Sequence, residues 1–178
     1  NDKKVRYLFI HGQLLEKINM LDSAQRVYNS ILDLGRKIPR LFWIHSKLKT
    51  LKIQTTISEI NPIRITRKLK RNYENFPYVH LIDQFEGRYY IDKGLDSLGI
   101  LSYNKSLESK SADIITRKSN YRELSDYFFK KGIFIKSGEY LDSLIQLMNK
   151  ESFIKKMTER ERRGLDRIIN LETIINNN

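Results

Sequence analysis

Apolar residues recur every three or four positions over the first forty residues of this chain and again over its last third. This spacing places them on one face of an α-helix and predicts helices that bury that face. The first two helices are expected to pair as a hairpin, which Gly35 ends as a left-handed residue shortly before Pro39. The segments with this pattern are residues 7–17, 22–34, 40–52, 121–129, 137–148 and 151–175.

The apolar period changes after residue 52. Ile53, Thr55 and Ile57 alternate with other residues, and β-branched side chains at a period of two predict short strands. Further strands are expected at residues 63–65, 78–82, 88–91 and 98–101, with a turn at 84–87 and an exposed loop at 104–112. The predicted fold class is therefore mainly α with a small β element (α+β), in which helical hairpins flank short strands near residues 53–103.

This pattern divides the chain into three regions. Residues 1–52 form a helical hairpin region, residues 53–112 hold basic residues, short strands and the loop, and residues 113–178 form a C-terminal helical region. A single domain that contains all three regions is the alternative, since 178 residues is close to the length of one average domain.

The positive charge is concentrated in one segment. The chain has 33 Lys and Arg against 21 Asp and Glu, which gives a formal net charge of +12. Residues 34–71 contain eleven of the basic residues and one acid, Glu59. A field concentrated in this way attracts phosphates and raises association rates. The basic residues of this run are Arg36, Lys37, Arg40, Lys47, Lys49, Lys52, Arg64, Arg67, Lys68, Lys70 and Arg71.

Aromatic side chains accompany the basic run. Single-stranded bases stack on aromatic faces that lie beside a cationic groove. We therefore predict a nucleic-acid partner whose phosphates contact the basic run, with Trp43 or Tyr73 as stacking platforms. The other interpretation is that the charges form solvated helix faces and that the aromatic rings belong to the core.

Several function classes are excluded or disfavoured by composition. The chain has no Cys, which excludes disulfide scaffolds, Cys-based zinc sites and thiolate nucleophiles. It has no run of about 20 apolar residues, so we expect no membrane span. Phosphate-binding glycine loops and nucleophile elbows are also missing. We therefore expect a protein without catalytic residues, metal or cofactor.

One acidic cluster keeps a catalytic alternative open. It contains Asp83, Glu86 and Asp92, which lie close together in sequence with His80 and Lys93. Metal-dependent nucleases hold Mg²⁺ with two or three carboxylates, often with a lysine nearby. A Mg²⁺-dependent nuclease that uses Asp83 and Glu86 is therefore the third functional hypothesis, although acidic residues are also common in turns.

The hairpin at residues 7–39 has a distinctive set of residues: Tyr7, Gly12 and Ala24 as small residues expected to touch, Leu21-Asp22-Ser23-Ala24, Tyr28, and Gly35 before Pro39. With these residues it resembles a tetratricopeptide or pentatricopeptide repeat. One such unit is recognised in the sequence. A pentatricopeptide hairpin implies RNA binding and an intracellular, organellar location, whereas a tetratricopeptide hairpin implies a protein partner.

Residues 120–149 combine apolar and glycine positions in a second recognisable pattern: Tyr121, Leu124, Phe128, Gly132-Ile133, Gly138, Leu144-Ile145 and Met148. With these residues the segment resembles a SAP or related helix–extended–helix motif. The resemblance implies two short helices joined by an extended segment at 133–135, and binding to DNA or RNA.

The sequence therefore favours a non-catalytic nucleic-acid-binding protein, with RNA favoured over DNA. The alternative is a helical protein-interaction or assembly subunit, for example of a ribonucleoprotein complex, whose charge would match an acidic partner.

Overall fold

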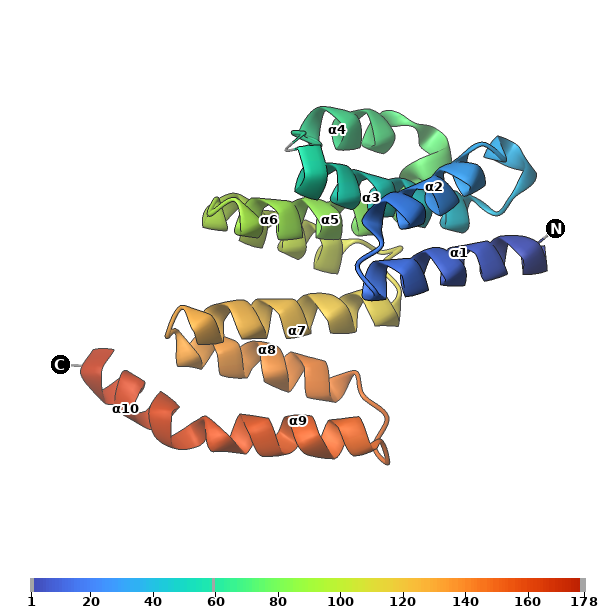
Figure 1. The fold of residues 1–178 in the computed structure, drawn as a ribbon. Coiled ribbons are helices and arrows are strands. Elements are labelled where there is room, and N and C mark those ends of the chain that lie inside the picture. Colours follow the sequence, from blue (N-terminus) through green and yellow to red (C-terminus); the bar gives the residue numbers. More distant parts are fainter. Residues whose placement is uncertain (1, 59, 177–178) are drawn as a thin grey trace.

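The computed structural model describes residues 2–58 and 60–176, and helices are the only regular elements in that part of the chain (Figure 1). The elements are α1 (Asp2–Lys17), α2 (Leu21–Leu32), the 3-10 helix η1 (Gly35–Lys37), α3 (Arg40–Ser58), α4 (Ile63–Arg71), the 3-10 helix η2 (Tyr73–Tyr78), α5 (Val79–Asp92), α6 (Asp96–Glu108), α7 (Ile114–Lys130), α8 (Phe134–Gln146), α9 (Phe153–Gly164) and α10 (Asp166–Asn176).

Neighbouring helices pack as hairpins that stack in chain order. The closest pairs are α1 with α2, α5 with α6, and α7 with α8. Between the pairs, α3 packs on α2, α7 packs on α5 and α6, and α9 packs on α8. In Figure 1, α4 lies at the top of the molecule, above α2 and α3, and α9 lies at the bottom. Each element contacts mainly its neighbours in sequence, which is the organisation of a stacked helical array.

Three hairpins close with the same turn. Asn19, Gly94 and Gly132 have positive φ angles of 61°, 73° and 73°. In each hairpin the N–H of the following residue donates to a carbonyl five positions back, from Met20 to Leu15 in the first. The same bond joins Leu95 to Tyr90 and Ile133 to Phe128. This pattern satisfies the last carbonyls of the first helix and starts the second helix at once.

A shared hairpin frame extends from this turn into the helices. It begins with a small residue on the first helix, and the other positions are counted from that residue. The positive-φ residue is seven positions later, a second small residue is twelve positions later, and a large buried residue is sixteen positions later. They are Gly12, Asn19, Ala24 and Tyr28 in the first hairpin, Gly87, Gly94, Gly99 and Tyr103 in the second, and Ser125, Gly132, Ser137 and Leu141 in the third.

This frame corrects one expectation. We expected one repeat-like hairpin, whereas three share the frame. We also expected the small residues Gly12 and Ala24 to touch, and the corresponding small residues of the third hairpin do so, since the Ser137 hydroxyl donates to the Ser125 carbonyl at 3.0 Å. Gly12 also makes room for the ring of Tyr28, which a Cβ on Gly12 would approach to 2.6 Å.

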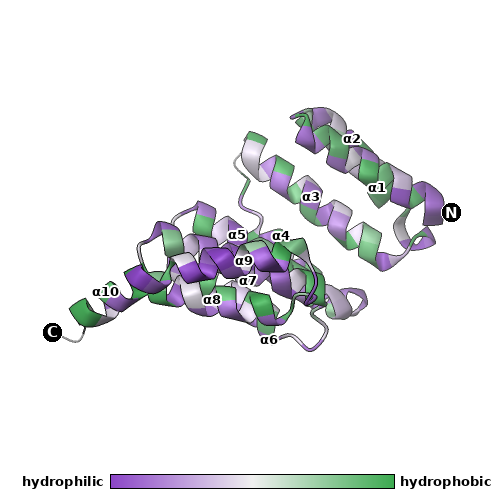
Figure 2. Cartoon of the chain, turned by 90° about the horizontal axis from the view of Figure 1, so that it is seen from below, coloured by the Kyte–Doolittle hydropathy of each residue, from purple (hydrophilic) through white to green (hydrophobic). Residues whose placement is uncertain are grey.

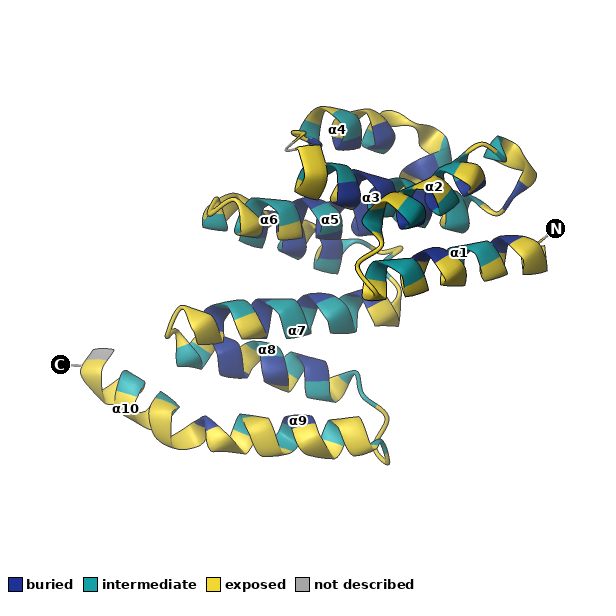
Figure 3. Ribbon diagram, in the orientation of Figure 1, coloured by how far each residue is buried: buried dark blue, intermediate teal, exposed yellow. Residues whose placement is uncertain are grey.

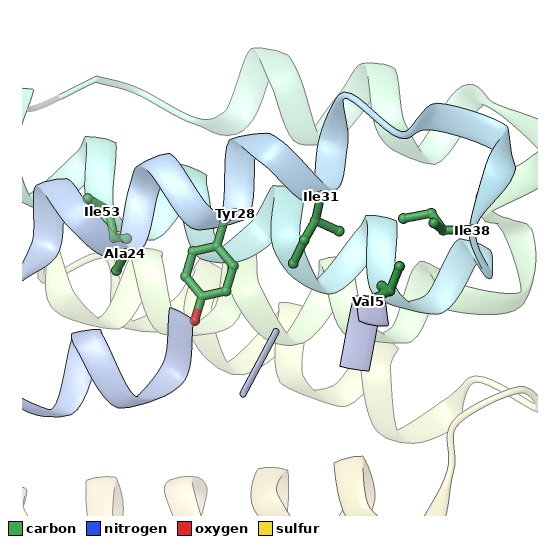
Figure 4. Packing of buried hydrophobic residues seen from close by; sticks show 6 residues of the cluster. All are labelled: Val5, Ala24, Tyr28, Ile31, Ile38 and Ile53. Carbon is green, nitrogen blue, oxygen red and sulfur yellow. The ribbon is translucent and has the colours of Figure 1, made fainter. Parts of the chain in front are cut away.

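Four buried apolar clusters follow one another along the array. The first joins α1, α2 and α3 through Val5, Ala24, Tyr28, Ile31, Ile38 and Ile53 (Figure 4). The second joins α3, α4 and α5, the third joins α6 and α7, and the last joins α8 to the α9–α10 junction. Hydrophobic and hydrophilic residues alternate around most helices (Figure 2), and α9 and α10 are the most exposed (Figure 3).

The predicted β element is wrong. Ile53, Thr55 and Ile57 belong to α3, Ile63 and Ile65 lie in α4, residues 79–82 and 88–91 lie in α5, and residues 98–101 lie in α6. The expected turn at 84–87 is the middle of α5, and α6 extends through most of the expected loop to Glu108.

A physical reason accounts for each error. Ile53 and Ile57 are each two residues from Thr55, which fits a strand, but they are four residues from each other, which fits a helix. The same segment therefore also fits a helix that continues from Leu48 and Leu51. The segment Val79–Ile82 does not show the one-sided apolar pattern of a surface helix, because α5 is buried on several sides and buries His80 together with Leu81 and Ile82. Gly87 is required by the close approach of Tyr103 and not by a turn.

The C-terminal segment is helical as expected but not extended at its centre. Gly132 and Ile133 form the shared turn, and α8 begins at Phe134, so residues 134–135 are helical rather than extended. Ser137 lies inside α8, and its hydroxyl donates to the carbonyl of Ser125. Within the described residues, no helix is both long enough and apolar enough to cross a membrane.

Candidate nucleic-acid interface

Helix α4 has one buried and one basic face. Thr66 and Leu69 are buried, and Leu69 and Ile65 pack with apolar residues of α3 and α5. The helix begins after Asn61 and Pro62, where the Asn61 side chain accepts a hydrogen bond from the N–H of Ile63 at 3.0 Å. The exposed residues of α4 are Arg64, Arg67, Lys68 and Arg71, here called the α4 basic face.

The spacing of the α4 basic face places its four charges together. Positions i, i+3, i+4 and i+7 lie on one side of a helix and extend over about 10 Å along its axis. Among the described residues, no ion pair involves any of these four side chains. Like charges at these spacings repel by about 0.2–0.5 kcal/mol per pair. A surface of this kind is stabilised by an anionic partner.

Lys70 lies on the other side of α4 and has a structural role. Its Nζ is 2.5 Å from Asp83 Oδ1 and 2.5 Å from Glu86 Oε2, both on α5. Burial lowers the pKa of Lys70, but the hydrogen bonds and charges of the two carboxylates outweigh it and raise that pKa. Burial raises the pKa of Asp83 despite the nearby ammonium group. Lys70 therefore attaches α4 to α5 and leaves the other four charges outward.

Two exposed aromatic rings follow the α4 basic face. Tyr73 and Phe76 in η2 are 71% and 58% exposed. The segment is anchored by Asn75, which is fully buried and donates from Nδ2 to the carbonyl of Leu69 at 2.8 Å. Arg40 Nε donates to Asn75 Oδ1 at 2.7 Å. An ordered segment therefore holds two stacking surfaces directly after the charged helix.

The remaining predicted residues are divided between several surroundings. Arg36 pairs with Glu74 at 2.9 Å, Arg40 pairs with Glu74 at 3.5 Å, and Lys49 pairs with Glu16 at 2.9 Å. Lys37 and Lys52 are exposed and Lys47 is half-buried. Glu59, the acid within the run, lies outside the described residues. The run therefore does not form a single surface, and α4 holds its densest exposed part.

Trp43 is placed as a core residue with a covered face. Its ring packs against the first two apolar clusters, and the guanidinium of Arg40 lies 3.9 Å from the ring centre. A cation in this position occupies the face that a base would need. Of the two predicted stacking platforms, Tyr73 is the accessible one.

The acidic cluster is divided between two faces of α5. Asp83 and Glu86 are buried and both bond Lys70, whereas Asp92 is exposed at the end of the helix and lines a cavity. In the described part of the chain, no three His, Asp or Glu side chains are grouped closely enough to hold a metal ion.

A cavity of about 410 Å³ lies between α3, α5 and α7, and the sequence did not indicate it. Its wall includes Arg88, Tyr103 and Glu123. Glu123 accepts from Arg88 Nε, from the Tyr103 hydroxyl and from the Ser119 hydroxyl, each at 2.6 Å. These residues come from three helices, and no motif in the sequence connects them.

This network predicts a pH dependence of stability. Burial raises the pKa of Glu123, but bonds from Arg88, Ser119 and Tyr103 outweigh it and bring that pKa below its ordinary value of 4.5. The folded state therefore binds this proton less readily than the unfolded state does. Its stabilisation is present above pH 4.5 and is lost as pH falls through the lowered pKa. We expect Glu123→Gln to reduce stability by about 1–2 kcal/mol at pH 7 and to flatten the acid decline.

Urea titrations between pH 3 and pH 7 measure this effect. Glu108→Gln, which changes an exposed carboxylate at the end of α6, is the control and should keep the wild-type slope. Equal slopes in the wild type and Glu123→Gln would show that the network does not control the acid decline.

No protein-family model matches the sequence, and no curated protein matches it at a significant level. Function is therefore inferred from the chain's own side chains.

Proposed function

We propose that this protein binds single-stranded nucleic acid, with RNA favoured over DNA, through the α4 basic face and without catalysing a reaction on it. The observation that carries this proposal is that Arg64, Arg67, Lys68 and Arg71 share one exposed helix face, while carboxylates of the described residues hold only Lys70 among the α4 cations. Four cations in one row form a footprint for consecutive phosphates.

The neighbouring aromatic rings favour a single strand over a duplex. Tyr73 and Phe76 expose their rings beside α4, and unpaired bases stack on such rings, whereas paired bases do not offer their faces. RNA is favoured by the resemblance of the first hairpin to a pentatricopeptide unit. A resemblance of residues 120–149 to SAP-like motifs would favour DNA, so the experiment compares both polymers.

The test is a charge reversal restricted to α4. The variant combines Arg64→Glu, Arg67→Glu, Lys68→Glu and Arg71→Glu and leaves Lys70 in place, because reversing Lys70 would put a third carboxylate beside Asp83 and Glu86. Four phosphate contacts predict that wild-type affinity falls by about 50-fold between 50 and 200 mM salt. The variant should bind a labelled 20-nucleotide RNA at least 100-fold more weakly, measured by fluorescence anisotropy, with an unchanged thermal midpoint.

A matched control separates a specific surface from total charge. Lys156, Arg160, Arg163 and Arg167 form another exposed basic row on α9 and α10, and reversing them changes the net charge equally. We expect this control to keep affinity within about threefold of wild type. Equal losses in the two variants, or undiminished binding after the α4 reversal, would reject the α4 site. Single-stranded DNA and duplex DNA of the same length test the polymer preference.

A different surface favours the alternative function, a helical protein-interaction module. That surface is the exposed apolar side of α1.

A further inference from the structure

Helix α1 has an apolar row on its outer side. Tyr7, Ile10, Leu14 and Ile18 are 70%, 41%, 55% and 65% exposed, and are here called the α1 row. Ile18 lies just after the last helical residue. Contiguous exposed apolar residues of this kind mark interaction surfaces.

The hairpin frame shows what the α1 row corresponds to inside the molecule. Tyr7, Ile10, Leu14 and Ile18 lie five and two positions before, and two and six positions after, the small residue Gly12. The residues with the same offsets from Ser125 in the third hairpin are Asn120, Glu123, Tyr127 and Lys131.

All four corresponding residues contact the preceding hairpin. Asn120 Oδ1 accepts from Gln84 Nε2 at 2.7 Å, and Glu123 bonds Arg88 and Tyr103. Lys131 pairs with Asp96 at 2.7 Å, and Tyr127 packs on the cluster around Tyr103.

Helix α5 repeats this use of the same positions. Ile82, five positions before Gly87, is fully buried in the cluster with Ile44, Leu48 and Leu51 of α3. Phe85, two positions before Gly87, packs against the same cluster. All four positions of the α1 row in α7, and the first two of them in α5, thus belong to the surface that stacks on earlier helices.

The surroundings of the α1 row give the charge of its partner. The exposed cations on α1 are Lys3, Lys4, Arg6 and Lys17. The carboxylate of Glu16 accepts hydrogen bonds from Tyr28 and Lys49. Two hollows of about 470 Å³ flank the row, one bordered by Lys4 and His11 and the other by Lys17 and Lys49. A partner surface that is apolar at its centre and acidic at its border therefore matches the α1 row.

We propose that the α1 row receives a helical hairpin of another protein, apolar at its centre and acidic at its border, in the way that α7 receives the α5–α6 hairpin. A second copy of this chain is a poorer match. The exposed apolar residues on α9 and α10 lie among Lys155, Lys156, Arg160 and Arg163 as well as Glu159 and Glu161, so this surface does not have the acidic border that matches the lysines of α1.

The test uses designed helical-hairpin probes and the full chain. One labelled probe has leucines along its contact face and glutamates at the border, and its twin has lysines at the border. We expect the glutamate probe to bind at least tenfold more tightly than the lysine probe. The double variant Ile10→Lys with Leu14→Lys should weaken the glutamate probe at least tenfold by anisotropy. The control, Leu98→Lys with Leu101→Lys on α6, changes two leucines of similar exposure and should stay within twofold of wild type.

The outcomes that reject the proposal are distinct. Equal binding of the two probes would show that the partner does not need an acidic border. Unchanged binding of the glutamate probe to the α1 variant would show that the α1 row is not the binding site. Sedimentation of the chain without probe is the second measurement: a dimer that the α1 variant abolishes would assign the row to a second copy. Tyr7→Gln with Leu14→Gln repeats the test if the lysine variant loses helical structure.

Discussion

Replacing Lys70 with alanine should lower the free energy of unfolding by about 3 kcal/mol at pH 7, because two buried carboxylates lose the cation that they share. The side chains of Asp83 and Glu86 are only 8% and 11% exposed, so water replaces little of the lost interaction. We expect the lower end of the usual range because the Lys70 side chain is itself 26% exposed. The measurement is urea unfolding followed by circular dichroism.

Two further variants distinguish this charge effect from a simple loss of side-chain volume. Lys68→Ala, two residues earlier on the exposed face of α4, should change stability by no more than about 0.5 kcal/mol. Lys70→Met combined with Asp83→Leu and Glu86→Leu should recover most of the loss, because an apolar set of similar volume avoids the cost of buried charge. The explanation fails if Lys68→Ala costs as much as Lys70→Ala.

Gly87→Val should also destabilise the protein by about 3 kcal/mol, the upper range for forcing an additional group into a packed core. A Cβ at this position would lie 2.8 Å from the ring of Tyr103. That ring is 4% exposed and its hydroxyl is bonded to Glu123, so it cannot move aside without breaking the network at the cavity. Thermal and urea unfolding measure the effect.

The chain provides a matched control for this steric effect. A Cβ on Gly164, the last residue of α9, has no neighbouring atom within 4 Å, so Gly164→Val should be neutral within about 0.5 kcal/mol. In a Tyr103→Ala background, Gly87→Val should lower the free energy of unfolding by at least about 1 kcal/mol less than in the wild type, because the obstructing ring is gone. A coupling energy of this size is usual for residues in contact. Equal costs in the two backgrounds would contradict a clash with this ring.

The helices whose burial is one-sided could be predicted from the sequence. In α2 the buried residues Ala24, Tyr28 and Ile31 recur at spacings of four and three, and Gly35 after this helix has the positive φ that the sequence predicts. Helix α5 could not be recognised in this way, because it buries Asp83, Gln84 and Glu86 as well as Leu81 and Ile82. Polar groups buried in pairs hide the period of 3.6 on which the prediction depends.

The candidate site was predicted as a segment but not as a surface. The concentration of charge in residues 34–71 is visible in the sequence, and so is the basic character of α4. Lys49 pairs with Glu16, and Lys70 pairs with Asp83 and Glu86. Glu16 is distant from Lys49 in sequence, and the sequence predicts a turn, not a helix, around Glu86. Whether a lysine is available to a phosphate depends on such tertiary pairings, which charge counting does not give.

The turn at Asn19, Gly94 and Gly132 also bears on how the chain folds during synthesis. Each turn is closed by backbone hydrogen bonds within its own hairpin. The helices α1 and α2 can therefore pair before α5, which begins at Val79, has left the ribosome. Contacts that are local in sequence form quickly, and folding from the N-terminus proceeds one hairpin at a time. A growing chain of this kind presents one unfinished helix face to chaperones at each stage, and the next hairpin to emerge covers it.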